Sequence, residues 1–346
     1  MRRVRIALWL AGVAVFTGAA GASAAPFAYI TNEGDHAVSS DLSVIDTATN
    51  TVVATVPAVG LLPQGVAVSP DGSHAYVTSE HSNTVSVIAW VTNAAGASVP
   101  TVVATVPVGD GPIGVAVTPD GARVYVANIN SSTVSVIDTA TNAVVATITE
   151  GPNPLGVAVS PDGKRVYVAN WQANVVGNGT VGVIDTATNT VVTQALTAGL
   201  NPTGVAVTPD GSHVYVTNWS TDTVGVIETA SNSLVDVVLV GSKPEGVAVT
   251  PDGKSVYVVN TGDNTVSVIG TSTNLVVATV PVALAAQTAA VGIYPQGLAI
   301  THDGKSVYVA NTTANTMSVI ATATNTVVGT VPVGNGPVAF GNFIGP

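Results

Sequence analysis

The sequence predicts an all-β fold, a seven-bladed β-propeller with four antiparallel strands per blade, in which the C-terminal strand joins the N-terminal blade and closes the ring. Three observations carry this prediction. One pattern of strands and turns recurs along the chain, the interval from Tyr125 to Tyr167 is 42 residues (167 − 125), and the strands are short and apolar on both faces. A four-stranded repeat of this length is typical of a propeller blade, which buries both faces only between neighbours. The repeats are marked by Tyr29, Tyr76, Tyr125, Tyr167, Tyr215, Tyr257 and Tyr308.

Before the first repeat, residues 1–24 have the pattern of a secretory signal peptide. Arginines come first, an apolar stretch runs from Ile6 to Phe16, and Ala22-Ser23-Ala24 forms a small-residue cleavage site. The apolar stretch is too short and too rich in glycine and alanine for a membrane-spanning helix. We therefore predict export to the periplasm, the cell surface or the medium without membrane insertion, and a propeller domain at residues 25–346.

Charge and composition narrow the function. The net charge is −11, and removal of the N-terminal arginines makes it more negative. Charge therefore does not favour binding to nucleic acid or to an anionic membrane. The chain has no cysteine, which excludes disulfides, thiolate metal ligands and a cysteine nucleophile.

The third repeat illustrates how one blade is expected to fold. Its four strands are predicted at residues 114–117, 124–128, 133–137 and 144–147. Thr118-Pro119-Asp120-Gly121 is a turn, because proline presets φ, aspartate bonds its own backbone and glycine accepts a left-handed conformation. The first strand, Gly-Val-Ala-Val, has the smallest side chains and is assigned to the crowded hub. The fourth strand, often ended by proline, is assigned to the rim.

The two ends of the propeller are predicted to share one blade. The first repeat begins at Phe27-Ala28-Tyr29, which corresponds to a second strand with no first strand before it. Residues 336–344 correspond to a first strand without its turn. The tail is therefore expected to supply the hub strand of the blade that the N-terminal repeat begins.

The repeat motif resembles that of a known family. Tyr-Val-Thr-Asn at 215–218, Tyr-Val-Ala-Asn at 125–128, 167–170 and 308–311, and the Pro-Asp-Gly turns are similar to the YVTN-repeat β-propeller family over residues 27–344. The resemblance implies the propeller fold. It does not single out a function, because the family includes archaeal surface-layer proteins and exported bacterial proteins, and similar rings serve as lactonases, an antibiotic lyase or electron-transfer domains.

Strand direction alternates within a blade, so the loops divide between two faces of the ring. The top face is defined here by the loops from second to third strands and from blade to blade, and the bottom face by the other turns. Insertions at 33–40, 171–179 and 282–295 lengthen top loops, whereas 90–100, which holds Trp90, lengthens a bottom turn. Insertions gathered on one face are typical of a binding face, although drift in solvent-exposed loops explains them equally.

Charge is expected to divide between the same two faces. The top face is predicted to be acidic, with Lys243 as its one base. An acidic face attracts cations or basic partners, and the alternative is a solvated surface that keeps the protein soluble. The bases predicted for the bottom face, each beside a Pro-Asp-Gly aspartate, are Arg123, Lys164, Arg165, Lys254 and Lys305.

Two positions of the repeat vary between blades and face the top mouth of the axis. One position follows the strand-ending asparagine, and the other precedes the hub-strand glycine. Together they place apolar and aromatic residues on one arc of the mouth and polar residues on the opposite arc. Such an arc suits a small-molecule or peptide site; alternatively, the tryptophans only cap their blades. The candidate ligand- or partner-binding residues are Gln64, Ile129, Leu155, Trp171, Trp219, Glu245, Tyr294 and Gln296.

Groups for catalysis or metal binding are sparse. No nucleophile elbow, phosphate-binding loop, zinc-protease motif or haem-attachment motif occurs, so no catalytic residue is assigned and no cofactor is expected. A divalent cation is the one exception considered, because two histidines and three carboxylates fall on neighbouring top loops. These candidate metal ligands are Glu33, Asp35, His36, Glu80 and His81.

The sequence therefore favours an exported, monomeric binding or interaction module over an enzyme, with a protein, peptide or small molecule as its ligand. Two alternatives stay open. One is an enzyme of the lactonase or lyase kind that uses the top-face metal site, and the other is a surface-layer structural protein.

Overall fold

The computed structural model describes residues 26–34, 40–171, 179–197, 199–282 and 293–346. The expected signal peptide at 1–24 lies outside these residues, as do Asp35, His36 and the middle of each top-face insertion.

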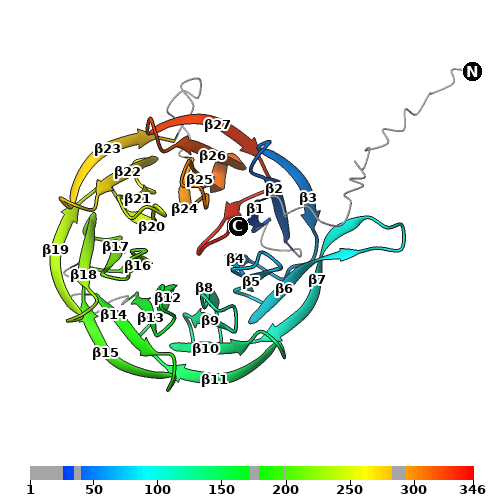
Figure 1. Ribbon diagram of the computed structural model, residues 1–346, viewed down its shortest axis with the longest axis horizontal. Helices are drawn as coiled ribbons and strands as arrows, with labels where there is room; N and C mark the ends of the chain where they lie inside the picture. Colours follow the sequence, from blue (N-terminus) through cyan, green and yellow to red (C-terminus); the bar gives the residue numbers. More distant parts are fainter. Residues whose placement is uncertain (1–25, 35–39, 172–178, 198, 283–292) are drawn as a thin grey trace, which may run out of the picture.

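The described chain forms seven four-stranded antiparallel sheets around a central axis, which confirms the predicted seven-bladed propeller (Figure 1). Blade 1 contains β28 (Pro337–Val338), β1 (Phe27–Asn32), β2 (Asp41–Asp46) and β3 (Thr51–Val56). Blade 2 contains β4 (Pro63–Val68), β5 (His74–Ser79), β6 (Thr84–Thr92) and β7 (Ser98–Pro107). Blade 3 contains β8 (Pro112–Val117), β9 (Arg123–Asn128), β10 (Thr133–Asp138) and β11 (Ala143–Thr149).

The remaining blades repeat the same order from hub to rim. Blade 4 contains β12 (Pro154–Val159), β13 (Arg165–Asn170), β14 (Thr180–Asp185) and β15 (Thr190–Leu196). Blade 5 contains β16 (Pro202–Val207), β17 (His213–Asn218), β18 (Thr223–Glu228) and β19 (Ser233–Leu239). Blade 6 contains β20 (Pro244–Val249), β21 (Ser255–Asn260), β22 (Thr265–Gly270) and β23 (Leu275–Pro281). Blade 7 contains β24 (Pro295–Ile300), β25 (Ser306–Asn311), the 3₁₀ turn η1 (Thr312–Ala314), β26 (Thr316–Ala321) and β27 (Thr326–Pro332).

Glycine allows the hub strands to approach one another around the axis. The hub strands of blades 2–7 each contain a β-bulge, as in β12, where pairing with β13 shifts between Pro154 and Val157. A Cβ placed on Gly156, inside this bulge, would overlap the carbonyl oxygen of Thr203 in blade 5. The same overlap with the next hub strand arises at Gly65, Gly114, Gly204 and Gly246. These glycines form a narrow ring, here termed the glycine neck.

Among the described residues, four pairs of neighbouring blades are also joined on the bottom face by a tyrosine–asparagine hydrogen bond. The phenol of Tyr257 in blade 6 donates to Oδ1 of Asn325 in blade 7 at 2.6 Å. Asn325 is in the turn between the third and fourth strands and has a left-handed backbone with φ of 52°, which asparagine tolerates well. The same tyrosine–asparagine bond joins Tyr125 to Asn189, Tyr215 to Asn274 and Tyr308 to Asn50.

Replacement of Tyr257 by Phe is expected to lower the free energy of unfolding by about 1–2 kcal/mol, because it removes one hydrogen bond and leaves the Asn325 oxygen unpaired. Tyr76 provides a matched control. Its expected partner, Asn142 Oδ1, has no hydrogen bond within the described residues, so Tyr76→Phe should cost much less. Urea unfolding of the two variants tests this difference, and equal losses would contradict it.

Blade 1 obtains its fastening from the bottom insertion. The strands β6 and β7 are lengthened into a hairpin that carries Trp90. The Trp90 indole N–H donates to the Tyr29 hydroxyl at 2.9 Å, and its ring stacks on Phe27 with centroids 4.9 Å apart. Trp90 thus takes the place of the turn asparagine, and the insertion at 90–100 has a structural role between blades 1 and 2.

The C-terminal tail closes the ring as predicted. The strand β28 pairs with β1, and the tail then continues between blades 1 and 2. The amides of Val66 and Val68 donate to the carbonyls of Phe340 and Asn342, and the Tyr29 amide donates to the carbonyl of Phe343. The tail residues Val338, Ala339, Phe343 and Ile344 are fully buried. The tail therefore belongs to the packing of both blades that it separates.

The bottom face pairs its bases with aspartates, but not all in the predicted way. The lysines lie beside Pro-Asp-Gly aspartates, with Lys305 Nζ 3.0 Å from Asp303 and Lys254 Nζ 3.4 Å from Asp252. Arg123 instead pairs with Asp138, the last residue of the third strand, and Arg165 pairs likewise with Asp185. Each arginine thus forms its ion pair with the aspartate opposite it on the adjacent strand rather than with a Pro-Asp-Gly aspartate, while the charge of Arg123 still acts on Asp120.

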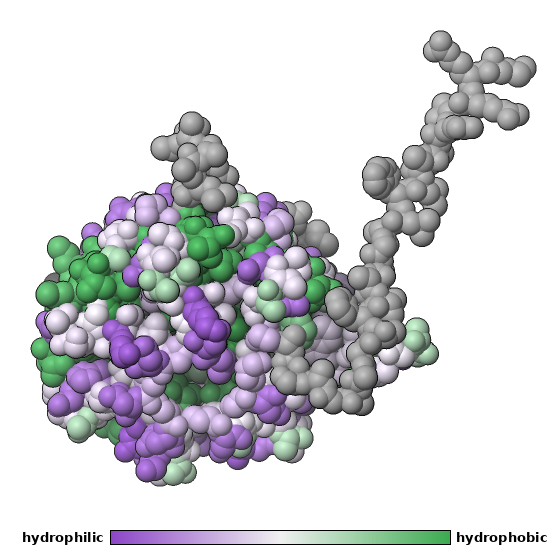
Figure 2. Space-filling view, turned by 45° about the horizontal axis from the view of Figure 1, so that its top comes forward, coloured by the Kyte–Doolittle hydropathy of each residue, from purple (hydrophilic) through white to green (hydrophobic). Residues whose placement is uncertain are grey.

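The rim strands are partly apolar and exposed. Figure 2 shows hydrophobic residues along the side of the ring that carries β19 and β23. The most exposed of them are Leu239, Leu275, Val277, Val235 and Val237. Within the described ranges, no helix has the length and apolarity needed to cross a bilayer.

Candidate functional site

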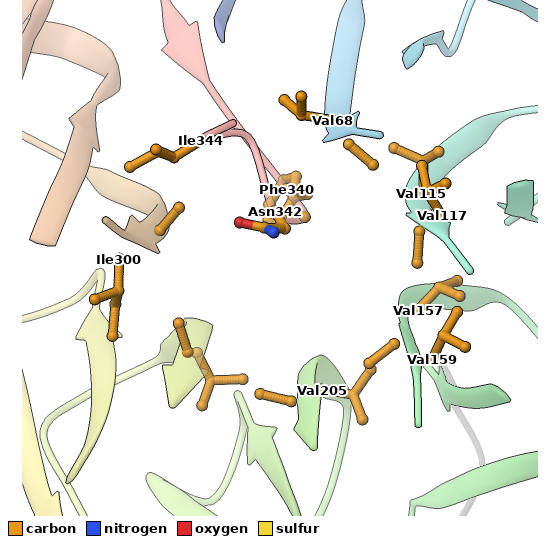
Figure 3. Close-up of a pocket in the computed structure, with 18 of the residues that line it drawn as sticks. Val68, Val115, Val117, Val157, Val159, Val205, Ile300, Phe340, Asn342 and Ile344 are labelled. Atoms are coloured by element: carbon orange, nitrogen blue, oxygen red, sulfur yellow. The ribbon is translucent and has the colours of Figure 1, made fainter. Parts of the chain in front are cut away.

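The axis holds a cavity below the glycine neck. It has a volume of about 500 Å³ and is lined mainly by valines of the hub strands. Figure 3 shows Phe340 and Asn342 of the tail pointing into it. The lining continues to His302 and to the prolines of the bottom turns, and it includes none of the residues predicted to bind a ligand. The predicted residues therefore lie above the neck and this cavity below it.

A repeated turn builds the top face above the neck. The residue before the hub-strand proline has a left-handed backbone in all seven blades, with φ of 53° at Lys243 and 49° at Tyr294. Its carbonyl accepts the amide of the residue that follows the strand-ending asparagine, as Asn201 does from Trp219. The seven left-handed residues are Leu62, Gly111, Asn153, Asn201, Lys243, Tyr294 and Gly336.

Lys243 and Tyr294 are unusual occupants of this turn. Glycine and asparagine adopt left-handed backbone conformations readily, whereas a long or aromatic side chain there costs on the order of 1 kcal/mol. Both residues are exposed, Tyr294 at 42%. Both also flank Glu245, which is two residues after Lys243. Strain of this kind concentrates at functional sites, and apart from Leu62 in blade 2 it falls in the sector of blades 5 to 7.

Two predicted aromatic residues meet in the adjacent sector. Trp171 and Trp219 have ring centroids 5.5 Å apart with their planes at 58°. The Lys243 ammonium lies 4.8 Å from the centroid of the Trp219 ring, within the range of a cation–π contact. The structure thus brings Trp171, Trp219 and Lys243 together across blades 4, 5 and 6.

Glu245 is a carboxyl group buried with incomplete pairing. The residue is 9% exposed, and its Oε2 has no hydrogen-bond partner among the described residues. Burial raises the pKa of Glu245 to about 7, since desolvation outweighs the opposing effects of Thr261, Trp219 and Lys243. Glu245 lies in the β-bulge, and the Thr217 hydroxyl donates to its carbonyl at 2.6 Å. The bulge and this bond fix where the carboxyl group points.

Tyr294 completes this group of side chains. Burial and, after it, the charge of Glu245 raise the pKa of Tyr294, so the phenol and the carboxyl group lie close to each other. The site therefore contains Trp171, Trp219, Lys243, Glu245 and Tyr294, and is termed the aromatic–carboxylate site.

The other predicted ligand-binding residues lie elsewhere around the mouth. Ile129 and Leu155, in blades 3 and 4, are half-buried. Gln296 Oε1 accepts the Thr312 hydroxyl at 3.1 Å in blade 7. Gln64 is engaged by the two glutamates described below. These residues surround the axis, but the contacts of the aromatic–carboxylate site do not extend to them.

The candidate metal ligands come together only in part. Gln64 Nε2 donates to Glu33 Oε1 at 2.9 Å and lies 3.3 Å from Glu80 Oε2. The amide thus occupies the space between the two carboxylates, and His81 is exposed. Among the described residues, no three His, Cys, Asp or Glu side chains are grouped for a metal ion. The contribution of Asp35 and His36 lies outside these residues.

Lys243 was missed as a site residue by the sequence reasoning. Lys243 had been noted only as the one base on an acidic face. A stronger signal was available, since lysine occupies a position that glycine or asparagine fills in four of the seven repeats. Glu245, two residues after Lys243, is the one carboxylate at the position before the hub-strand glycine, which the other repeats fill with apolar or uncharged residues.

Comparisons with known proteins agree with this architecture. The family model described as "Lactonase, 7-bladed beta-propeller" matches residues 44–177, 138–244 and 241–331. A hydrazine synthase structure from Kuenenia stuttgartiensis is similar with a TM-score of 0.68 and 26% identity, over 80% of this chain and 88% of that one. No curated protein matches the sequence.

A second solved structure shares the fold. It is a protein of unknown function from Desulfotomaculum acetoxidans, with a TM-score of 0.69 and 20% identity over 90% of this chain and 98% of that one. At this level of identity, the likeness shows the fold alone.

Proposed function

The chain belongs to the lactonase, seven-bladed β-propeller family, and on that premise we propose that it is a binding protein for a small ligand. The ligand is held on the top face at the aromatic–carboxylate site. Within the family, we further propose that the chain is one of the YVTN-repeat propellers, since its strand-ending motifs repeat around the ring.

One observation carries the binding proposal, the incompletely paired carboxyl group of Glu245. A buried polar atom without a partner costs on the order of 1–3 kcal/mol, and Oε2 of Glu245 is such an atom among the described residues. Its backbone is already fixed by the bulge and by Thr217. A ligand that donates to Oε2 would remove the cost, and the indole rings beside it offer a surface for apolar or cationic groups.

An enzyme is the second candidate, and two findings favour it. The matching family is described as a lactonase, and a carboxyl group with a pKa near 7 has the value that general acid–base catalysis requires at neutral pH. In that case Glu245 is the acid or base. Hydrolysis of simple lactones that Glu245→Gln abolishes would establish this candidate over a purely binding role.

Location and assembly are also proposals. The N-terminal pattern supports export to the periplasm, the surface or the medium, which N-terminal sequencing of the protein from its host would test. If the protein is instead a surface-layer structural protein, it should assemble increasingly as its concentration rises. The binding proposal is made for a monomer without nucleic acid or membrane partners. Sedimentation measurements separate the two.

Replacement of Trp171 and Trp219 together by Ala is expected to weaken ligand binding at least tenfold, because each indole contributes stacking area at the site. Ligand-detected NMR with a fragment mixture of neutral, anionic and cationic compounds supplies probes for the full chain. The matched control is Trp90→Ala, which removes an indole from the bottom face. Fragments that bind the wild type and the double variant equally would overturn the proposed site.

A further inference from the structure

We propose that the aromatic–carboxylate site binds a small organic ammonium ion, which takes the place of the Lys243 ammonium over Trp219 and pairs with the Glu245 carboxylate. The inference rests on the proposed binding function and specifies its ligand. Three features of the site carry it: an ammonium already seated there, a carboxyl oxygen without a partner, and an excess of negative charge.

The protein's own lysine shows that the aromatic surface accepts an ammonium. Lys243 Nζ is 4.8 Å from the centroid of the Trp219 ring, and Trp171 packs beside it. The face of an indole ring is electron-rich and attracts cations. Lys243 is exposed, so its side chain can turn into solvent while the fold stays intact. The side chain therefore acts as a tethered competitor that a free ammonium ion can displace.

The Glu245 carboxyl group provides the ionic partner. Its Oε2 has no hydrogen-bond donor within the described residues and the residue is 9% exposed. An ammonium group brings several N–H donors or a compact positive charge, and either one pairs with a carboxylate more strongly in a desolvated site than in water. A neutral donor supplies a hydrogen bond to Oε2 without the attraction between opposite charges, and an anionic ligand is repelled by the carboxylate.

Charge around the site favours a cation as well. The Lys243 amide donates to Asp222 Oδ1 at 2.8 Å, and the Ser242 amide donates to Asp263 Oδ2 at 2.6 Å. Both aspartates thus lie against the turn that presents Lys243. With Glu245, three carboxyl groups lie on or against the turn that carries one ammonium, so this part of the surface favours a further positive charge over an anion.

Binding should depend on pH through Glu245. The groups that face it are Lys243 on its own turn, Tyr294 from blade 7, and Trp219 and Thr261 from blades 5 and 6. A carboxyl group with a pKa near 7 is mostly protonated at pH 6 and mostly ionised at pH 8. An ammonium ligand is therefore expected to bind up to about tenfold more weakly at pH 6 than at pH 8.

The experiment uses n-butylammonium, which reproduces the end of a lysine side chain, and 1-butanol as its neutral analogue. Isothermal titration of the full chain at pH 8 and constant ionic strength is expected to show binding of the ammonium and none of the alcohol. Lys243→Ala should bind it about three- to tenfold more tightly, because the tethered competitor is gone. Glu245→Gln should lose binding.

Matched variants separate the site from general charge effects. Lys254→Ala changes the net charge as Lys243→Ala does, and Glu228→Gln changes it as Glu245→Gln does, but both controls alter bottom-face residues. Both should bind n-butylammonium like the wild type. Folding is not the cause of loss in Glu245→Gln. Because its pKa is raised in the folded protein, Glu245 contributes to the free energy of unfolding fully below its unfolded pKa, and this contribution is lost as the pH rises through about 7. At pH 8 the Glu245→Gln variant should therefore melt at no lower a temperature than the wild type.

Three outcomes would overturn the inference. One is equal binding of 1-butanol and n-butylammonium, and another is ammonium binding that Glu245→Gln retains. The third is binding to Lys243→Ala but not to the wild type, which would mean that the lysine occupies the site permanently. If neutral or anionic fragments still depend on Trp171 and Trp219, the proposed binding function stands while this inference fails.

Discussion

A chain that lacks residues 336–346 is expected to lose most of its stability. The deletion removes the hub strand of blade 1 and the buried side chains of Val338, Phe343 and Ile344. Burial of each side chain contributes about 1.5–3 kcal/mol, and the amides of Val66, Val68 and Tyr29 lose their partners. The total approaches the net stability of a typical domain, about 5–15 kcal/mol. We expect a melting temperature lower by more than about 10 °C, or no folded protein at all.

Calorimetry of the truncated chain measures this loss. Deletion of Pro346 alone serves as the control, because this residue is exposed and belongs to no strand, so its loss leaves the strand pairing unchanged. Phe343→Ala should fall between the two, at a cost of about 3–5 kcal/mol. A truncated protein that melts with the wild type would show that the tail does not close the ring.

Replacement of Gly156 by Ala is expected to destabilise the protein by about 3 kcal/mol or more. The added methyl group overlaps the Thr203 carbonyl and comes within 3.2 Å of Gly204 Cα. These are backbone atoms of the adjacent blade, so relief requires the blades to separate rather than a side chain to rotate.

Gly329 provides a control in a rim strand. A Cβ placed there is 3.9 Å from the nearest atom, Val319 Cβ, so Gly329→Ala should be neutral or stabilising by up to about 1 kcal/mol. Urea unfolding of both variants gives the comparison. Similar free energies for Gly156→Ala and Gly329→Ala would refute the idea that the neck admits only glycine.

The sequence predicted the architecture because the repeat leaves few alternatives. Seven copies of the repeat gave the number of blades, and the small hub-strand residues with the rim prolines gave the strand order. The incomplete first repeat gave the closure by the tail. It did not reveal the fastening between blades, because a tyrosine and the asparagine that it contacts are in different repeats. Tyr257 and Asn325, for example, are joined only once the ring is formed.

The candidate site could be predicted in part. Trp171, Trp219, Glu245 and Tyr294 stood out because they depart from the repeat, and the structure gathers them in one sector. Lys243 was missed because its role depends on which way a left-handed turn directs the side chain. Of the proposed metal ligands, Glu33 and Glu80 both contact the Gln64 amide, and Asp35 and His36 lie outside the described residues.

The bond between tyrosine and asparagine has a consequence for how such a ring changes in size. Blades 6 and 7 each carry a tyrosine donor for the neighbour on one side and an asparagine acceptor for the neighbour on the other. A tandem duplication of one copy would therefore arrive with both of its connections supplied, and the circumference could grow without any compensating substitution. The number of blades must then be limited by the angle at which neighbouring blades pack around the axis.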